Sequence, residues 1–302
     1  MNIIFGPIIS RRFGKSLGID LSPNIKQCNF DCLYCELKSS RPVKNYDDVI
    51  SVDEILNQIQ NALKLYKDID VLTFTANGEP TLYPFLDELI KRVNKIKDNT
   101  KTLILSNAST ISDLKIQKSL QQFDSVKLSL DCFSQKCFKK LDRGVGVDIQ
   151  EIKHGIEEFS KIYKGELVIE VLVVKGINDK IEEIQKIGEF LKDVKPFRVD
   201  FGSIDRPPAY DVKGVEFEEL LRLSLLFPKT LKVTITSKKP ATTQKVYFSK
   251  EQILQTLKRR PLSQKDIKTL FDEEATANLK ELLAESKISL VKMNEEEFFT
   301  LN

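Results

Sequence analysis

Strand-like and helix-like segments alternate through residues 17–202, and this alternation limits the fold more than any other feature. Six short apolar runs have the composition of β-strands: residues 17–21, 69–75, 101–106, 125–131, 166–174 and 196–202. The segments between them place apolar residues at helical spacing: residues 51–66, 84–97, 111–121, 147–163 and 180–193. These repeats predict an α/β fold in which a parallel sheet is covered by helices and closes into an open (β/α)6 partial barrel. In such folds, ligands bind at the carboxyl ends of the strands.

Three cysteines follow the first predicted strand on one short loop. Cys28, Cys32 and Cys35 have the spacing C-x3-C-x2-C. A cubane iron–sulfur cluster normally takes four cysteines, so three thiolates leave one iron open to a small molecule. The alternatives are a zinc knot or cysteines that only pack. Zinc loops usually have a second ligand pair, and the one histidine, His154, lies far along the chain. The spacing therefore favours a catalytic cluster.

With Tyr34 directly before the last cysteine, this loop resembles the signature of the radical S-adenosylmethionine (SAM) superfamily. Residues 6–20 and 206–209 resemble the members that are related to the tRNA wyosine synthases. The resemblance implies a radical SAM partial barrel over residues 1–210 and a 4Fe-4S cluster held by the three cysteines. It also implies SAM on the open iron and an electron from a flavodoxin or ferredoxin. Reductive cleavage of SAM would then give a 5′-deoxyadenosyl radical that abstracts hydrogen from a substrate.

A glycine-acid turn follows the second predicted strand. Its residues, Asn77-Gly78-Glu79-Pro80, resemble the Gly-Gly-Glu-Pro motif of the superfamily, with Asn77 in place of the first glycine. By this resemblance, Glu79 or the backbone carbonyls beside it would bind the amino group of SAM. The alternative is a plain turn, because Gly and Pro commonly end a strand.

Polar residues also mark the ends of the third and fourth predicted strands. Asn107 follows the third strand, as a ligand contact or as an ordinary turn residue. On the fourth strand, Lys127, Ser129 and Asp131 share one face, which we expect to line the barrel interior. By resemblance, Ser129 and Asp131 match the ribose-contact position of the superfamily. The expected cofactor contacts are Tyr34, Asn77, Gly78, Glu79, Pro80, Asn107, Ser129 and Asp131.

Two further features of this region bear on chemistry. Glu170 interrupts an apolar strand, and a buried carboxylate needs a partner, for which Lys127 is the candidate. Cys132 and Cys137 follow the fourth strand, and we expect them to be packed or ordinary loop cysteines. Substrate-facing thiols, hydrogen-atom donors or part of an auxiliary cluster are the alternatives.

Three arginines are candidates for substrate binding. Arg11 and Arg12 belong to an N-terminal segment, residues 1–16, that has no acidic side chain. This segment is either a solvated arm or an arm against the mouth of the site that holds an anionic group. Arg206 precedes two prolines that fix an extended path, and we expect it to point at the substrate.

Composition excludes several classes of protein. The net charge of +3 does not by itself indicate a nucleic-acid partner. We find no apolar run that would span a bilayer and no signal-peptide pattern at the start. Five cysteines without a secretory signal argue against a disulfide framework. We therefore expect a cytoplasmic protein that does not contact a membrane.

The remaining third of the chain has a different pattern. Residues 211–245 read as a connecting segment with a short helix and a strand. Residues 246–302 predict a small winged-helix-like domain with helices at 249–258, 263–271 and 274–285 and strands at 287–293 and 297–301. Its second and third helices carry several acidic side chains, which favours protein docking or a structural cap over DNA reading.

Three functional hypotheses follow. One is a radical SAM enzyme that modifies a tRNA base or a nucleotide; wyosine synthases, however, have a second cluster on upstream cysteines, and this chain has no cysteine before Cys28. Another is a radical enzyme that acts on a small molecule or a protein. The third is a non-catalytic iron–sulfur redox sensor whose winged helix binds DNA or protein. Gly78-Glu79-Pro80 favours an enzyme, because a sensor needs no SAM pocket.

Overall fold

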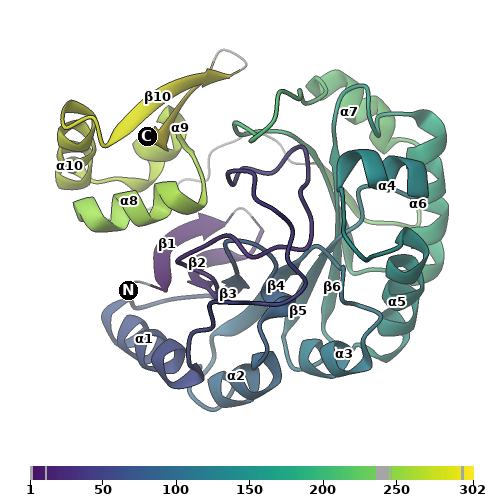
Figure 1. Cartoon of the computed structure of the whole chain (residues 1–302), viewed down its shortest axis with the longest axis horizontal. Helices are drawn as coiled ribbons and strands as arrows, with labels where there is room; N and C mark the ends of the chain where they lie inside the picture. The colour runs from purple at the N-terminus through teal and green to yellow at the C-terminus, as the bar shows by residue number, and fades with distance from the viewer. Residues whose placement is uncertain (1–2, 11, 236–244, 246, 294–295) are drawn as a thin grey trace.

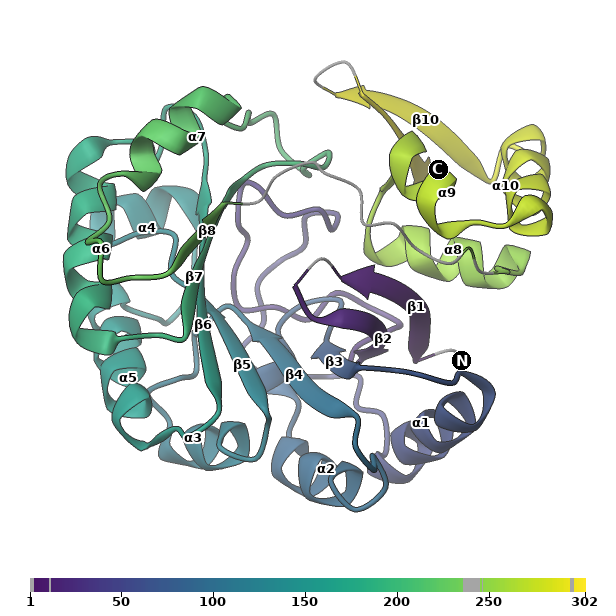
Figure 2. The same cartoon turned by 180° about the vertical axis from the view of Figure 1, so that it is seen from behind.

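The computed structural model describes residues 3–10, 12–235, 245, 247–293 and 296–302. Among them, eight strands form one curved sheet in chain order (Figure 1, Figure 2). The strands are β1 Ile4–Ser10, β2 Gly14–Asp20, β3 Val71–Thr75, β4 Lys101–Ser106, β5 Ser125–Ser129, β6 Glu166–Val173, β7 Arg198–Ser203 and β8 Val233–Ile235. Strand β1 is antiparallel to β2, and every later pair is parallel. The six predicted strands are confirmed as β2 to β7.

Helices cover the outer face of this sheet (Figure 1). They are α1 Val52–Leu65, α2 Leu86–Val93, α3 Leu114–Leu120, α4 Gln135–Leu141, α5 Ile149–Ile162, α6 Ile181–Val194 and α7 Phe217–Ser224, with a short 3-10 turn, η1, at Pro80–Leu82. Helix α1 illustrates why they form. Ser51 caps its first turn by accepting from the Glu54 backbone amide, and Ile55 and Ile59 are fully buried against the sheet. The five predicted helices of this region are confirmed.

The N-terminal segment is a strand rather than an arm. Residues 4–10 pair with β2 as β1, and the turn that carries Arg12 lies at the amino end of β2. Arg12 Nη1 is 2.5 Å from Asp200 Oδ2 and 3.8 Å from Glu170 Oε1. Arg12 therefore points into the barrel from the edge opposite the carboxyl ends, and the expected position at the mouth of the site is not observed. Arg11 lies outside the described residues.

Charged side chains fill part of the barrel interior, and we call Arg12, Lys127, Glu170, Arg198 and Asp200 the interior ion cluster. Lys127 donates to Glu170, which confirms the predicted pair. Lys127 Nζ also lies 3.5 Å from Asp200 Oδ2, and Arg198 Nε donates to Asp200 Oδ1 at 2.9 Å. Burial alone would raise the pKa of Asp200, but Lys127, Arg12 and Arg198 outweigh it and lower that pKa.

The C-terminal unit has its own hydrophobic cluster, which includes Phe248, Leu279 and Phe299. It consists of α8 Lys250–Arg259, β9 Leu262–Ser263, α9 Gln264–Leu270, α10 Glu273–Ala284, β10 Ile288–Met293 and β11 Glu296–Leu301. The strands form an antiparallel sheet in the order β10-β11-β9. Helix α7 and strand β8, by contrast, belong to the first sheet and its core, although residues 211–245 were expected only to connect. Within the described residues, no helix combines the length and apolarity needed to cross a membrane.

Candidate active site

The cysteine loop lies at the carboxyl edge of the parallel sheet. Its backbone is held by the end of α4, because Leu33 N donates to Leu141 O at 2.9 Å and Asp31 N donates to Asp142 O at 3.2 Å. Cys28, Cys32 and Cys35 are unpaired and partly exposed. Lys26 Nζ lies 3.5 Å from Cys35 Sγ. Three free thiols are therefore presented on one rigidly held loop.

The glycine-acid turn is joined to this loop through Gln27. Gln27 N donates to Asn77 O, and Glu79 N donates to Gln27 O, both at 2.9 Å. Gly78 has a φ of +140°, and a β-carbon there would lie 1.9 Å from the Gln27 carbonyl oxygen. Only glycine permits this approach. The turn therefore sits directly beside Cys28.

The carboxylate of Glu79 is fully engaged inside the protein. Its Oε1 accepts hydrogen bonds from Thr81 N, Thr81 Oγ1 and Ser106 Oγ, and its Oε2 accepts from Asn107 N at 2.7 Å. Burial raises the pKa of Glu79, while these hydrogen bonds act in the opposite direction. The carboxylate, one of the two alternatives for the amino group of SAM, instead anchors the turn to β4. The carbonyls of Asn77, Glu79 and Pro80 already accept from Gln27 N, Tyr46 OH and Tyr83 N, so Gly78 O is the carbonyl of the turn to which no described residue donates.

Four of the expected cofactor contacts line one small cavity at the ends of β4 and β5: Tyr34, Asn107, Ser129 and Asp131. Asn107 Nδ2 lies 3.6 Å from Cys28 Sγ, and Tyr34 donates its hydroxyl to Asp131 Oδ2. Asp131 Oδ1 accepts from Leu172 N at 2.7 Å. Burial raises the pKa of Asp131 to about 7, although the bond from Tyr34 opposes this. The cavity thus joins the cysteine loop to polar strand ends.

The sequence model of the Radical SAM superfamily matches residues 25–191. The chain belongs to the radical SAM superfamily. It is a radical SAM enzyme, and the cofactors of the superfamily are a 4Fe-4S cluster and SAM.

Individual relatives agree with this assignment. A UPF0026 protein of Helicobacter pylori is 44% identical over 98% of this chain and 97% of its own length. A Streptococcus suis SuiB structure bound to S-adenosylmethionine aligns over 74% of this chain and 47% of its own, with a TM-score of 0.54 and 20% identity. A TYW1 structure with a lysine-pyruvate adduct aligns over 70% of this chain and 72% of its own, with a TM-score of 0.52 and 19% identity. The two structures show that the fold is shared.

The cysteine loop fits the superfamily's cluster better than it fits a single metal ion. Sulfur ligands of one zinc ion lie roughly 3.8 Å apart, because each Zn–S bond is about 2.3 Å. Across the described residues, the one group of three potential ligands whose atoms lie within 4.8 Å of one another contains none of these thiols. Burial raises the pKa of Cys28 to about 12, and the positive charge of a bound metal would favour its thiolate.

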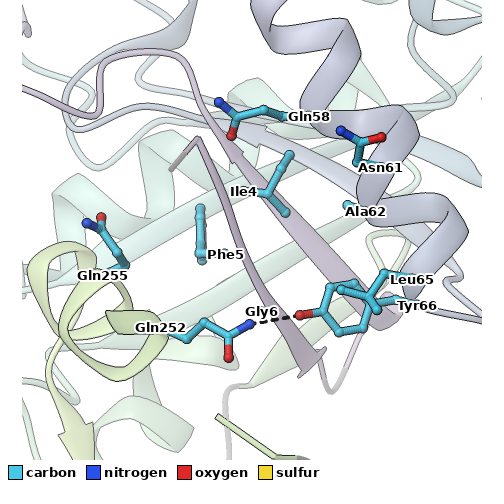
Figure 3. Close-up of a pocket in the computed structure, with 10 residues that line it drawn as sticks. All are labelled: Ile4, Phe5, Gly6, Gln58, Asn61, Ala62, Leu65, Tyr66, Gln252 and Gln255. Atoms are coloured by element: carbon cyan, nitrogen blue, oxygen red, sulfur yellow. Dashed lines mark hydrogen bonds between the residues drawn. The ribbon is translucent and has the colours of Figure 1, made fainter. Parts of the chain in front are cut away.

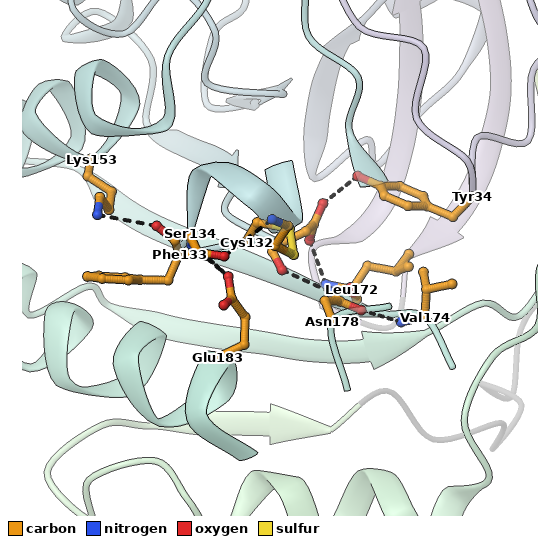
Figure 4. The surroundings of a disulfide bond; sticks show 11 residues. Tyr34, Cys132, Phe133, Ser134, Lys153, Leu172, Val174, Asn178 and Glu183 are labelled. Atoms are coloured by element: carbon orange, nitrogen blue, oxygen red, sulfur yellow. Dashed lines mark hydrogen bonds between the residues drawn. A yellow bond between two sulfur atoms is a disulfide. The ribbon is translucent and has the colours of Figure 1, made fainter. Parts of the chain in front are cut away.

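Cys132 and Cys137 are joined by a disulfide, which the sequence did not predict (Figure 4). Helix α4, also unpredicted, brings Cys137 back over Cys132, with a Cα–Cα distance of 5.6 Å. Glu183 Oε1 holds the intervening loop by accepting from Phe133 N and Ser134 N. Cys132 is fully buried. Both cysteines are buried, as the packed interpretation expects, but they form a disulfide that none of the alternatives included, so neither sulfur is a free thiol in this structure.

Arg206 does not point toward the cavity. Its Nε donates to Pro261 O at 3.1 Å, and its Nη1 lies 3.6 Å from Glu36 Oε1. It is drawn there by the carboxylates of Glu36, Asp205 and Asp266. The substrate contact stays a prediction, and in this structure Arg206 ties the residue after Cys35 to the C-terminal unit.

Sequence reasoning missed Asp20 and Gln27 as parts of the site. Asp20 Oδ1 accepts from Asn77 N at 2.8 Å, and Gln27 pairs with both sides of Gly78. Two signals were available: Asp20 is a polar residue at the carboxyl end of the first parallel strand, and Gln27 directly precedes Cys28. Neither signal identifies the partner, which lies across the sheet.

Proposed function

We propose that Cys28, Cys32 and Cys35 hold the cluster, that the Asn77–Pro80 turn and the cavity beside it hold SAM, and that the substrate carries phosphate, as a nucleotide or a tRNA does. When bound, these cofactors supply a 5′-deoxyadenosyl radical that abstracts hydrogen from the substrate. The observation that carries the proposal is the Gln27–Gly78 bridge, which sets the glycine turn against the residue before Cys28.

Each side chain then has a definite role. The carbonyl of Gly78, to which no described residue donates, would accept from the amino group of SAM. Ser129 and Asp131 would contact the ribose, with Tyr34 orienting the Asp131 carboxylate. Asn107 would fix the turn against the cysteine loop through its contacts to Glu79 and Cys28. These residues bind and orient, while Phe30 and Phe138, whose rings pack edge to face, exclude water from the cavity floor.

Support for a phosphate-bearing substrate comes from charge segregation. Seven exposed basic residues lie on two segments, the stretch after Cys35 and the α4 region whose end holds the cysteine loop, and we call them the basic rim: Lys38, Arg41, Lys44, Lys136, Lys139, Lys140 and Arg143. Residues 37–46 contain no acidic side chain, and the one acid in residues 134–147, Asp142, is buried. A net charge of +3 thus conceals a local excess of positive charge, which favours a polyanion.

The basic rim is continuous with the site. The lysines of α4 share its outer face, because Cys137, Phe138 and Leu141 are buried on the other. Arg143 Nη1 lies 3.1 Å from Asp31 Oδ2, inside the cysteine motif. A phosphate chain bound on the rim would therefore reach the carboxyl edge of the barrel. The electron would come from a flavodoxin or ferredoxin.

For the C-terminal unit we propose a winged-helix architecture over residues 246–302. The barrel domain is residues 1–210, to which α7 and β8 add a further helix and strand. A DNA-binding domain needs exposed basic residues that can contact the phosphates of DNA. The basic end of α8 instead contacts the barrel, and the first turn of α10 carries Glu273 and Glu274. We therefore propose a structural role for this unit and do not favour a DNA-binding redox sensor.

Release of 5′-deoxyadenosine tests the cofactor part of the proposal. Reconstituted protein with SAM and dithionite should release it, and Cys32→Ala should lose both the cluster and the release. A Cys132→Ala/Cys137→Ala variant should keep its iron content, because these sulfurs bind each other. A wild-type chain with a normal cluster and no release would refute the proposal.

Binding of bulk tRNA tests the substrate part. Lys139→Glu/Lys140→Glu should weaken binding about tenfold or more and flatten its dependence on salt. Lys115→Glu/Lys118→Glu, an equal charge change on the outward face of α3, is the matched control and should bind as wild type does. Nucleosides of tRNA from cells with and without the protein should then differ. Equal loss in both variants, or no binding by wild type, would contradict a tRNA substrate.

A further inference from the structure

The end of helix α8 in the C-terminal unit lies against the barrel beside the cysteine loop. Lys258 Nζ donates to Pro23 O at 2.7 Å, and Arg259 Nε donates to Asp20 Oδ2 at 2.8 Å. Asp20 ends β2, and Pro23 belongs to the short segment that leads from β2 to Cys28. A C-terminal helix therefore holds the entry to the cysteine loop.

The Arg259–Asp20 ion pair is buried, with side chains that are 7% and 2% exposed. The Arg259 guanidinium also stacks 4.7 Å from the centroid of the Phe5 ring. The second oxygen of the carboxylate, Asp20 Oδ1, accepts from Asn77 N at 2.8 Å and from Ser22 N at 2.9 Å. One carboxylate therefore connects α8 directly to the glycine turn that we propose for SAM.

Further contacts fix α8 relative to the barrel. Two turns earlier on the same face of the helix, Gln252 Nε2 donates to Tyr66 OH at 2.9 Å, beside a pocket between α8, β1 and α1 (Figure 3). Just beyond its end, Pro261 O accepts from Arg206, which also reaches Glu36 beside Cys35. The helix is thus fastened at several points and can hold Asp20 in one position.

We infer that Arg259 is a positioning residue for SAM that acts through Asp20 on the Asn77–Gly78 turn, so that the C-terminal unit forms part of the cofactor site. The inference rests on the proposed function, in which this turn binds SAM. A buried carboxylate without its cation is strongly unfavourable. Without Arg259, Asp20 would turn toward water, and the Asn77 amide would lose its charged acceptor. The turn would then shift relative to Gln27.

The test compares Arg259→Met with Lys250→Met in the full chain with a reconstituted cluster. Lys250 is on the same helix but pairs with Glu281 and Glu285 inside the C-terminal unit, which makes it the matched control. Arg259→Met should weaken SAM binding about 10- to 100-fold, as loss of a residue behind a ligand does. It should also reduce the change that SAM causes in the electron paramagnetic resonance spectrum of the reduced cluster. Lys250→Met should match wild type in both, and Arg259→Lys should be intermediate.

Hydrogen exchange in the cofactor-free protein gives a second readout. Peptides that cover residues 76–80 should exchange faster in Arg259→Met than in Lys250→Met, while peptides from α5 should not differ. Equal SAM affinity and equal exchange in these two variants would overturn the inference. If Arg259→Met does not fold, Arg259→Lys decides: a lowered SAM affinity supports the inference, and wild-type affinity overturns it. A wild-type chain that carries the cluster but binds no SAM would instead refute the proposed function, and the exchange result would still decide whether Arg259 holds the turn.

Discussion

The interior ion cluster and the carboxyl-end site are both polar regions of one barrel, but their groups find partners in different ways. In the ion cluster, Asp200 is fully buried and is contacted by Arg12, Lys127 and Arg198. At the carboxyl end, the three thiols form no disulfide, and Asn107 and Lys26 approach two of them only at 3.6 Å and 3.5 Å.

This difference indicates that the interior ion cluster stabilises the barrel, while the carboxyl-end site can bind a ligand. Buried charges that pair with one another fix the packing of the strands that carry them. In the ion cluster, Arg198 Nη2 is the buried polar atom that has no hydrogen-bond partner among the described residues. Thiols that form no disulfide and accept only long hydrogen bonds, such as those from Phe30 N and Asn107 Nδ2 to Cys28, can still coordinate metal beside a polar cavity. The contrast follows the general rule for barrels of parallel strands, in which the carboxyl ends carry function and the amino ends carry stability.

Gly78→Ala should have the largest effect, and it should act on function. A β-carbon 1.9 Å from the Gln27 carbonyl oxygen cannot be accommodated, so the bridge between the turn and the cysteine loop must open. A displaced turn should weaken SAM binding roughly 100-fold, measured by calorimetry on the reconstituted protein.

Gly176→Ala is its matched control. Gly176 also has a positive φ, +73°, but nothing lies within 4 Å of its β-carbon position. It should show only the cost of the backbone conformation, on the order of 1 kcal/mol of stability, with SAM affinity unchanged. Equal losses of SAM affinity in both variants would mean that the close approach to Gln27 is unimportant.

Asp200→Ala should have the next largest effect, and it should act on stability. Removing the carboxylate leaves three cations in the barrel with Glu170 as their remaining carboxylate in the cluster. The free energy of unfolding should fall by about 3–5 kcal/mol, measured by urea denaturation. Glu219→Ala, which breaks an exposed pair with Arg222, should have little effect. If folded Asp200→Ala instead lost SAM affinity at unchanged stability, the two regions would not be separable.

The β/α repeats could be predicted from the sequence because the spacing of apolar residues shows which face of a strand or helix is buried. The run that became β6 is apolar almost throughout, and Ile55 and Ile59 of α1 follow helical spacing. Helix α4 was missed because it has only seven residues, three of them lysines. Strand β1 was missed because its glycine and proline are typical of turns.

The parts of the candidate site that lie in short sequence motifs could be predicted. The position of a side chain whose partner is far along the chain could not. The cysteine spacing and the glycine turn are short motifs, and the structure places both at one edge. Arg12 and Arg206 looked equally suited to an anion. Their positions, however, are set by Asp200, 188 residues away, and by Pro261, 55 residues away. No pattern within either segment contains that information.

Asp131→Asn should have the smallest effect. Asp131 lies between the interior ion cluster and the carboxyl-end site, because it accepts a hydrogen bond from Tyr34 and its pKa is affected by the charges of Glu170 and Lys127. Its pKa is raised from 3.8 to about 7 in the folded protein, chiefly by burial. Between these two pH values, the folded state holds a proton that the unfolded state has released, so this group makes the free energy of unfolding fall as the pH rises toward 7.

In the cofactor-free protein, Asp131→Asn removes this pH dependence. Its stability relative to wild type should therefore increase between pH 5 and pH 8 by on the order of 1–3 kcal/mol, measured by denaturation at each pH. A stability difference that stays constant over this range would show that Asp131 is already ionised in the fold and that the cavity is more polar than its lining indicates.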